Sequence, residues 1–342
     1  MPHKLYDFDI AKLEIYLQDN IADFGSLNSM IKFSDGQSNP TYKLSTNTGN
    51  YVLRAKPPGK LLGSAHQVDR EFRVMKNLAN TGVVVPKMYH LAGDENPLGA
   101  MFFIMEFIDG RILWDPRLPD ASHQQRSQYY AEMNQALATL HEVDIEACGL
   151  ADFGKPGNYF VRQTGRWVKQ YRAAETIKDA KIDRIIDWLN ANMVDDDGQV
   201  SLVHGDYRMD NMVFATDETK LIAILDWELS TIGHGLADLA YQCMQWRLSA
   251  DAGLGGLGGI KREEFGIPSE ADYVEQYLTA RNLPPIENWN FYLLFGIFRL
   301  IAIVQGVIKR AIDGNASDPK SKNRMIKVSG HLSQLANDLI NQ

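Results

Sequence analysis

Residues 202–211 read Leu202-Val203-His204-Gly205-Asp206-Tyr207-Arg208-Met209-Asp210-Asn211. In this stretch a carboxylate, Asp206, stands five positions before an amide, Asn211. Fifteen residues after Asn211, a third polar side chain, Asp226, follows directly after the apolar run Leu221–Leu225. We expect the first two side chains to share a loop, and a hairpin of short strands to return Asp226 to that loop.

The three side chains match the needs of phosphoryl transfer. A carboxylate orients the acceptor hydroxyl and takes its proton, and oxygen ligands hold the Mg²⁺ that bridges the nucleotide phosphates. Because Mg²⁺ keeps several waters, one Asn and one Asp are enough protein ligands. Protein kinases have a similar spacing in His-Arg-Asp followed by Asn, although Gly205 replaces the Arg here. The joint spacing therefore favours chemistry over separate roles as helix caps or turn residues.

Composition limits the class of protein. A length of 342 residues is enough for about two domains. The net charge of -8 argues against a general nucleic-acid binder, and two cysteines are too few for a disulfide framework. The most apolar stretch, Phe291–Ile308, contains Arg299 and Gln305, which favours a buried helix over a membrane span. With no signal sequence at the start, we expect a soluble, cytoplasmic protein without nucleic-acid or membrane partners.

Apolar periodicity separates a sheet-rich first part from a helical second part. In the first part we predict strands at 31–33, 41–45, 51–55 and 101–107 and helices at 9–19 and 65–79. In the second part we predict helices at 122–141, 183–190, 235–247, 270–281, 289–312 and 320–340, and strands at 202–203, 212–214 and 221–225. Ser122 is the predicted cap of the first of these helices. The turn at 107–109 is the natural boundary.

The most specific feature is His204-Gly205-Asp206 followed by Asn211 and by Asp226-Trp227-Glu228. On these residues the chain resembles the aminoglycoside phosphotransferase/choline kinase superfamily over nearly its whole length. It is most similar to the branch with the kinase-like N-terminal domains of some acyl-CoA dehydrogenases. Further matching segments are Phe33-Ser34-Asp35-Gly36-Gln37-Ser38-Asn39-Pro40-Thr41-Tyr42, Tyr51-Val52-Leu53-Arg54, Val68-Asp69-Arg70-Glu71, Met105-Glu106-Phe107-Ile108-Asp109-Gly110, Ile224-Leu225 and Phe298-Arg299.

The resemblance implies an α+β, protein-kinase-like two-lobed fold. Residues 1–107 would form a small, β-rich N-lobe that binds nucleotide. Residues 108–342 would form a larger helical C-lobe with the catalytic loop, the metal site and the acceptor pocket, and nucleotide would bind in the cleft between the lobes. Asp206 would be the catalytic base, and Asn211 and Asp226 would hold Mg²⁺.

The resemblance also implies a nucleotide site. Arg54 stands where many relatives carry the phosphate-binding lysine, and Glu71 would be its helix partner. Lys56, two residues further along a strand, would face the same side and stays an alternative. Ser34, Gly36, Ser38 and Asn39 would belong to the loop over the phosphates. The segment from Glu106 to Ile108 would be the hinge that offers backbone groups to adenine.

Two roles near the loop are less specific in the sequence. His204 and Asp238 are interpreted as structural supports of the catalytic loop. For Glu228, a role close to the metal and a place as a surface carboxylate fit the sequence equally well.

The expected reaction uses ATP, which the sequence does not distinguish from GTP, and a small hydroxylated acceptor. The apolar helix predicted at 289–312 and its few cations suit a hydroxy-acyl metabolite, such as a CoA ester, better than an amino sugar. The alternatives are an antibiotic phosphotransferase and a nucleotide-binding pseudokinase. A protein kinase is disfavoured because its Asp-Phe-Gly and Ala-Pro-Glu motifs are missing. The sequence leaves the oligomeric state open.

Overall fold

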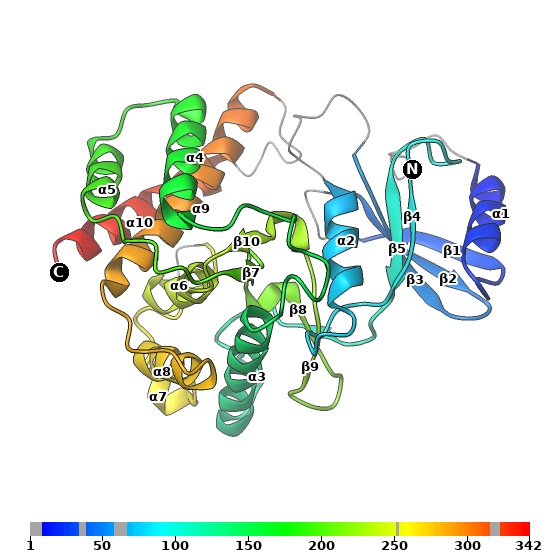
Figure 1. Ribbon diagram of the computed structural model, residues 1–342, viewed down its shortest axis with the longest axis horizontal. Coiled ribbons are helices and arrows are strands. Elements are labelled where there is room, and N and C mark those ends of the chain that lie inside the picture. Colours follow the sequence, from blue (N-terminus) through cyan, green and yellow to red (C-terminus); the bar gives the residue numbers. More distant parts are fainter. Residues whose placement is uncertain (1–8, 34–38, 58–66, 251–252, 315–321) are drawn as a thin grey trace. The chain divides into compact units, whose positions relative to one another are not determined.

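The computed structural model describes residues 9–33, 39–57, 67–250, 253–314 and 322–342. The chain divides into two compact units, shown in Figure 1. The first unit contains Met1–Arg111 and Ile222–Ser230, and the second contains Ile112–Leu221 and Thr231–Gln342. The sequence predicted a single boundary near residue 107. The division in the structure differs, because the later segment with Asp226 belongs to the first unit.

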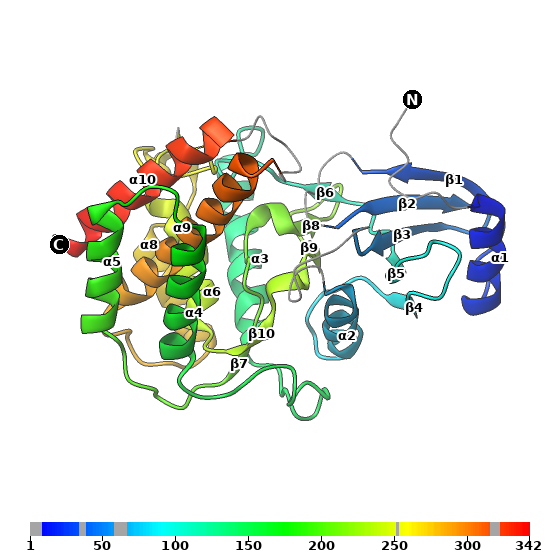
Figure 2. The same cartoon turned by 90° about the horizontal axis from the view of Figure 1, so that it is seen from above.

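The first unit is built on a five-stranded antiparallel sheet in the order β1-β2-β3-β5-β4, which can be followed in Figure 2. Its strands are β1 Leu27–Lys32, β2 Thr41–Thr46, β3 Asn50–Ala55, β4 Met88–Ala92 and β5 Phe102–Glu106. The register places Arg54 of the central strand β3 opposite Thr41 on β2 and Phe103 on β5. Arg54 is therefore held by strands on both sides.

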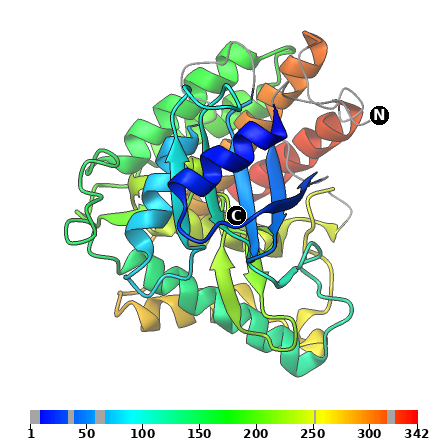
Figure 3. The same cartoon turned by 90° about the vertical axis from the view of Figure 1, so that its right-hand side faces the viewer.

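Two helices cover opposite faces of this sheet. Helix α1, Ile10–Asn20, is capped by the side chain of Asp9 and lies across the strands, as Figure 3 shows. Its Leu13 and Leu17 belong to the same buried cluster as Leu53. Helix α2, Val68–Leu78, packs against β4 and β5. Because side chains alternate along a strand, Arg54 points to the face opposite Leu53, where α2 lies.

The segment 222–230 completes the first unit. Strand β9, Leu221–Ile224, ends where the amide of Ile224 donates to the carbonyl of Val84 at 2.9 Å. Asp226 follows, and a single 3₁₀ turn, η2 Trp227–Leu229, packs against α2. Asp226 is thereby brought to the same helix that carries Glu71.

The second unit is mainly helical. Its helices are α3 His123–His141, α4 Tyr159–Ala174, α5 Ala180–Ala191, α6 Leu236–Arg247, α7 Arg262–Phe265, α8 Glu270–Ala280, α9 Trp289–Ile312 and α10 Lys322–Ile340. Its short elements are β7 Ser201–Val203, β8 Met212–Phe214, β10 Thr231–Gly233 and the 3₁₀ turn η1 Met209–Asn211, and β6 Arg111–Ile112 lies at the unit boundary. Strands β7 and β10 pair antiparallel. Helix α3 begins with a capping box formed by Ser122 and Gln125, which confirms Ser122 as the predicted cap.

Helix α9 forms the core of the second unit and packs against α4, α6 and α10. It has the length and the apolar composition of a membrane-crossing helix, with a mean hydropathy of 2.1, but 83% of that window is buried inside the protein. Its two polar interruptions, Arg299 and Gln305, are buried as well. The amide of Gln305 donates to the carbonyl of Ala174 at 2.9 Å. Helix α9 is therefore a buried core helix, as predicted.

Candidate active site

The first unit gathers three carboxylates around Arg54. The Nε atom of Arg54 lies 2.9 Å from Oε2 of Glu71, although the two atoms are not aligned for a hydrogen bond. The Nη2 atom donates to Oδ1 of Asp226 at 2.7 Å and lies 3.8 Å from Oε2 of Glu228. One guanidinium therefore faces three carboxylates that come from α2 and from the segment after β9.

Burial sets the electrostatics of this cluster. Glu71 is 2% exposed, and burial raises its pKa to about 8, against the opposing effect of Arg54. Burial also disfavours the charged form of Arg54, but Glu71, Asp226 and Glu228 outweigh it and raise the pKa of Arg54. Arg54 is thus a permanent cation, and the planar guanidinium suits bidentate contact with phosphate oxygens.

The structure separates the two candidates for the phosphate-binding cation. Strand β3 ends at Ala55, one residue before Lys56, and the Lys56 amide donates to the carbonyl of Met101 at 2.9 Å. Arg54 is the side chain that reaches Glu71. The arrangement favours Arg54 over Lys56 for this role.

Replacing Arg54 with alanine should weaken the binding of ATP more than the binding of adenosine, because only ATP carries the charge that a guanidinium would neutralise. Replacing Lys56 with alanine should change both affinities little. Calorimetric titration of each variant with both ligands measures the difference, and adenosine serves as the internal control for folding. The opposite ranking of the two variants would assign the phosphate contact to Lys56.

Asp226 adopts an uncommon backbone conformation. Its φ of 64° and ψ of 59° lie in the left-handed region, where aspartate is tolerated better than most residues. Strained backbone of this kind clusters at functional sites. Its neighbour Glu228 belongs to the same cluster, because it lies near Arg54 and accepts a hydrogen bond from Nδ2 of Asn39 at 3.4 Å.

The other residues predicted for nucleotide binding are described in part. Ser34, Gly36 and Ser38 lie outside the described residues. Asn39 is buried beside Glu228, as stated above. Glu106 ends β5, and its Oε2 accepts from the amide of Lys87 at 3.1 Å, while Ile108 follows the strand and is half-buried. The roles of Glu106 and Ile108 as a hinge stay a prediction.

The second unit carries the catalytic loop, with Asp206 and Asn211 in direct contact. The Nδ2 atom of Asn211 donates to both the backbone oxygen and Oδ2 of Asp206, each at 2.9 Å. The 3₁₀ turn η1 places Asn211 so that it closes back on the loop. Among the described residues, no hydrogen bond to Oδ1 of Asn211 is formed, which leaves a hard oxygen suited to Mg²⁺.

The backbone of the loop is fixed from α6. The buried carboxylate of Asp238 accepts from the amides of His204 and Gly205 at 2.6 and 2.8 Å. His204 in turn accepts from the amide of Asp206 at its Nδ1, at 3.1 Å. Gly205 has a φ of 88°, which favours glycine. Burial raises the pKa of Asp238, but its hydrogen bond with His141 and other interactions outweigh this and keep that pKa low. His204 and Asp238 are therefore supports of the loop, as interpreted from the sequence.

Two further side chains near Asp206 received no role from the sequence. Tyr241 on α6 is buried near Asp206, and burial, followed by the charge of Asp206, raises the pKa of its phenol. Arg299 on α9 donates to the carbonyl of Gly205. Both lie within long buried stretches of their helices, so their sequence pattern resembles that of plain core positions.

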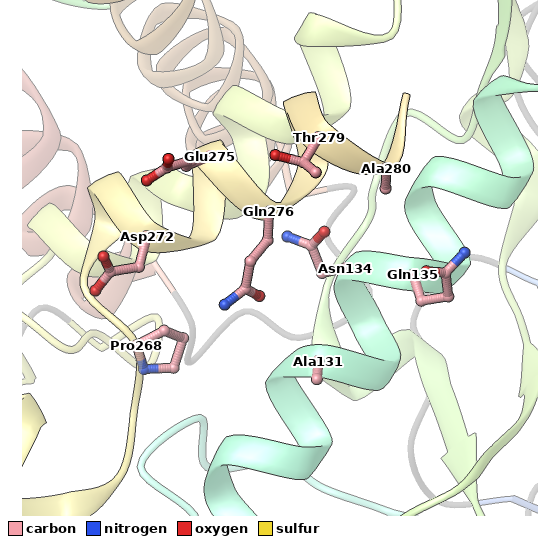
Figure 4. A pocket seen from close by; sticks show the side chains of 9 residues that line it. All are labelled: Ala131, Asn134, Gln135, Pro268, Asp272, Glu275, Gln276, Thr279 and Ala280. Atoms are coloured by element: carbon pink, nitrogen blue, oxygen red, sulfur yellow. The ribbon is translucent and has the colours of Figure 1, made fainter. Parts of the chain in front are cut away.

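A surface pocket in the second unit lies between α3 and α8 (Figure 4) and has a volume of about 660 Å³. Asn134 and Gln276 point toward its interior. Its lining consists of Ala131, Asn134, Gln135, Pro268, Asp272, Glu275, Gln276, Thr279 and Ala280. None of the predicted site residues belongs to this lining, so the pocket is separate from the catalytic loop.

Comparison with known proteins decides the family. The model of the family described as "Phosphotransferase enzyme family" (APH) matches residues 29–273. The chain belongs to this phosphotransferase family. Acyl-CoA dehydrogenase family member 10 of Mus musculus is 42% identical over 312 residues, which cover 90% of this chain and 29% of that protein. This phosphotransferase family member therefore spans less than a third of that relative's length.

Solved structures show the fold of the family. A candidate aminoglycoside phosphotransferase from Ralstonia eutropha matches with a TM-score of 0.88 and 42% identity, over 98% of this chain and 99% of that one. The aminoglycoside phosphotransferase APH(4)-Ia, in a ternary complex with AMP-PNP and hygromycin B, matches with a TM-score of 0.64 and 16% identity over 95% and 97%. The predicted kinase-like α+β fold and the branch of the superfamily are both confirmed.

Proposed function

We propose that this family member is a Mg²⁺-dependent phosphotransferase that moves the γ-phosphate of ATP to a hydroxyl group of a small molecule. The observation that carries the proposal is the pairing of Asp206 with Asn211. The amide nitrogen of Asn211 fixes the carboxylate, and its oxygen remains available for a cation. Membership of the phosphotransferase family and the AMP-PNP complex of APH(4)-Ia support the use of ATP.

The charged groups divide the work of phosphoryl transfer. Asp206 would accept the proton of the acceptor hydroxyl, and Arg54 would contact the phosphate oxygens. Asn211 and Asp226 would hold Mg²⁺, and the bound ion would neutralise charge between the β- and γ-phosphates. Within the described ranges, no group of three or more His, Cys, Asp or Glu side chains could hold a metal. Two protein oxygens completed by water and nucleotide are the coordination that Mg²⁺ prefers.

The acceptor is proposed to be an anionic hydroxy-acyl metabolite. A polycationic amino sugar would need a cluster of carboxylates, and three of the described acidic residues after α6 are engaged locally. Glu270 pairs with Arg247 at 2.9 Å, Glu264 pairs with Lys261 at 3.0 Å, and Asp272 accepts from the hydroxyl of Ser269 at 2.6 Å. The apolar core helix α9 and the acyl-CoA dehydrogenase names of the relatives support an acyl chain.

Hydroxyacyl-CoA esters should therefore release ADP from Mg·ATP faster than kanamycin-type amino sugars offered at the same concentration. The measurement is coupled ADP release with each acceptor, and the Asp206→Ala variant is the control for release that does not depend on the site. Faster release with the amino sugars would contradict the acceptor proposal and favour an antibiotic phosphotransferase. If wild type and Asp206→Ala release ADP at the same rate with every acceptor, the release does not depend on the site, which would favour a nucleotide-binding pseudokinase.

A further inference from the structure

The peptide group between Gly205 and Asp206 sets the direction in which the Asp206 side chain leaves the catalytic loop. Gly205 has a φ of 88°, and because glycine has no Cβ it changes backbone conformation more readily than other residues. At one end of this peptide group, the amide of Asp206 donates to Nδ1 of His204 at 3.1 Å. At the other end, the carbonyl of Gly205 accepts from Nη2 of Arg299 on α9. A rotation of the peptide group would break both hydrogen bonds.

A second helix holds other backbone groups of the same segment. Asp238 on α6 accepts from the amides of His204 and Gly205 at 2.6 and 2.8 Å. Arg299 comes from α9, the buried core helix of the unit, and holds the carbonyl of Gly205. Because a hydrogen bond from a charged donor is about twice as strong as a neutral one, the guanidinium is a firm anchor for that oxygen. The loop is therefore fixed from two helices, each of which binds different backbone groups.

Arg299 lies in the core without a carboxylate partner. It is 4% exposed, and its Nε has no hydrogen-bond partner. Its guanidinium lies 5.2 Å from the ring centre of Tyr241 and 5.5 Å from that of Trp167. None of the ion pairs among the described residues includes Arg299. A buried cation with two rings and a carbonyl as its partners is expensive for stability, which points to a role other than packing.

We propose that Arg299 is a positioning residue, which holds the Gly205–Asp206 peptide group in the orientation that directs the Asp206 carboxylate at the acceptor hydroxyl. The inference rests on the proposed function. In that reaction the acceptor O–H bond breaks and its proton moves to Asp206. A bond forms between the acceptor oxygen and the γ-phosphorus, and the bond between that phosphorus and ADP breaks. Arg299 takes no part in these bond changes and acts through the loop.

The test is the Arg299→Met variant, which keeps a long side chain in the core and removes the hydrogen-bond donors. The assay is ADP release from Mg·ATP with water as the acceptor, because water needs no knowledge of the natural substrate. We expect kcat to fall about 10–100-fold, a part of the usual contribution of a positioned acid–base group. The KM for Mg·ATP should stay within about twofold of the wild-type value, because Arg299 acts on Asp206 and not on the nucleotide.

The matched control is Gln305→Met. Gln305 is another buried polar side chain of α9, and its amide donates to the carbonyl of Ala174 at 2.9 Å. Both variants exchange a buried polar side chain of the same helix for methionine, so both should change Tm, and only Arg299→Met should lower kcat. Equal kcat in the two variants, beside an active wild type, would overturn the positioning role and leave the proposed function standing.

Arg299→Gln serves if Arg299→Met does not fold. Glutamine keeps a polar head group in the core, but its side chain is neutral and shorter, so it should not hold the carbonyl of Gly205 as a guanidinium does. We expect the same loss of kcat at an unchanged KM. A folded Arg299→Gln protein with the kcat of wild type would also overturn the inference.

A double variant separates positioning from a general loss of structure. If Arg299 acts through Asp206, adding Arg299→Met to Asp206→Ala should change the residual kcat by less than about twofold, because the group being positioned is already gone. Losses that multiply would show that Arg299 acts independently of Asp206 and would overturn the inference. If wild type and Asp206→Ala release ADP equally, the proposed function itself fails, which is a distinct result.

Discussion

Replacing Asp206 with asparagine should lower turnover by about 10²–10⁴-fold while the affinity for ATP stays nearly unchanged. Asparagine has the same shape and can still accept the hydrogen bond from Asn211, but it cannot take a proton. The loop should keep its conformation because its backbone is held by Asp238 and His204, not by the Asp206 side chain. Steady-state ADP release gives the turnover, and calorimetry gives the affinity.

Asp210→Asn is the control for this experiment. Asp210 lies in the same loop, and its carboxylate pairs with Arg208 at 2.8 Å without contacting Asn211. Removing that charge should leave turnover within a few-fold of wild type, since no proton transfer depends on it. If Asp206→Asn is as active as Asp210→Asn, Asp206 is not the catalytic base.

Replacing Asp226 with alanine should abolish the Mg²⁺-dependent part of nucleotide binding. The ion supplies much of the charge that bridges the β- and γ-phosphates, and Asp226 is the carboxylate proposed to hold it. The measurement is titration with ATP in the presence of Mg²⁺ and again in the presence of EDTA. Wild type should bind more tightly with Mg²⁺, and the variant should show the same weak affinity in both buffers.

The control is Asp217→Ala, which removes an exposed carboxylate from the turn between β8 and β9. Its Mg·ATP affinity should equal that of wild type. Unchanged Mg·ATP binding in Asp226→Ala would show that Asp226 is not a ligand. Weakening that is equally large with and without Mg²⁺ would assign Asp226 to the support of Arg54, which it contacts at 2.7 Å.

Local chemistry made much of the fold predictable. The turn formers at 47–50 correctly predicted the hairpin of β2 and β3, and Ser122 correctly marked the start of α3. Helix α4 could not be predicted in the same way. It begins at Tyr159, the preceding Asn158 has a left-handed conformation and makes no side-chain cap, and Gly165 interrupts its sequence. Local signals identify an element only where the chain itself supplies a cap, a turn or an unbroken apolar face.

The candidate site was predictable where its residues are close in sequence. The spacing of Asp206 and Asn211 indicated that they share a loop, and in the structure the two side chains are in contact. The spacing could not separate Arg54 from Lys56, because strand alternation gives both the same face and only the end of β3 distinguishes them. The proximity of Tyr241 to Asp206 was not predictable, because α6 is buried nearly all round and no polar stripe marks one of its faces.

The discontinuity of the first unit has a consequence for biosynthesis. A ribosome makes the sheet, Arg54 and Glu71 early, but it makes the segment 222–230 only after residues 112–221. Until then the Glu71 carboxyl lacks the backbone hydrogen bond from Trp227, which lowers its pKa against the effect of burial. Domains generally fold as units during synthesis, N-terminal ones first. Here the first unit stays incomplete until residues 222–230 have been made, so we expect a fragment ending at Arg111 to be less stable than the complete unit.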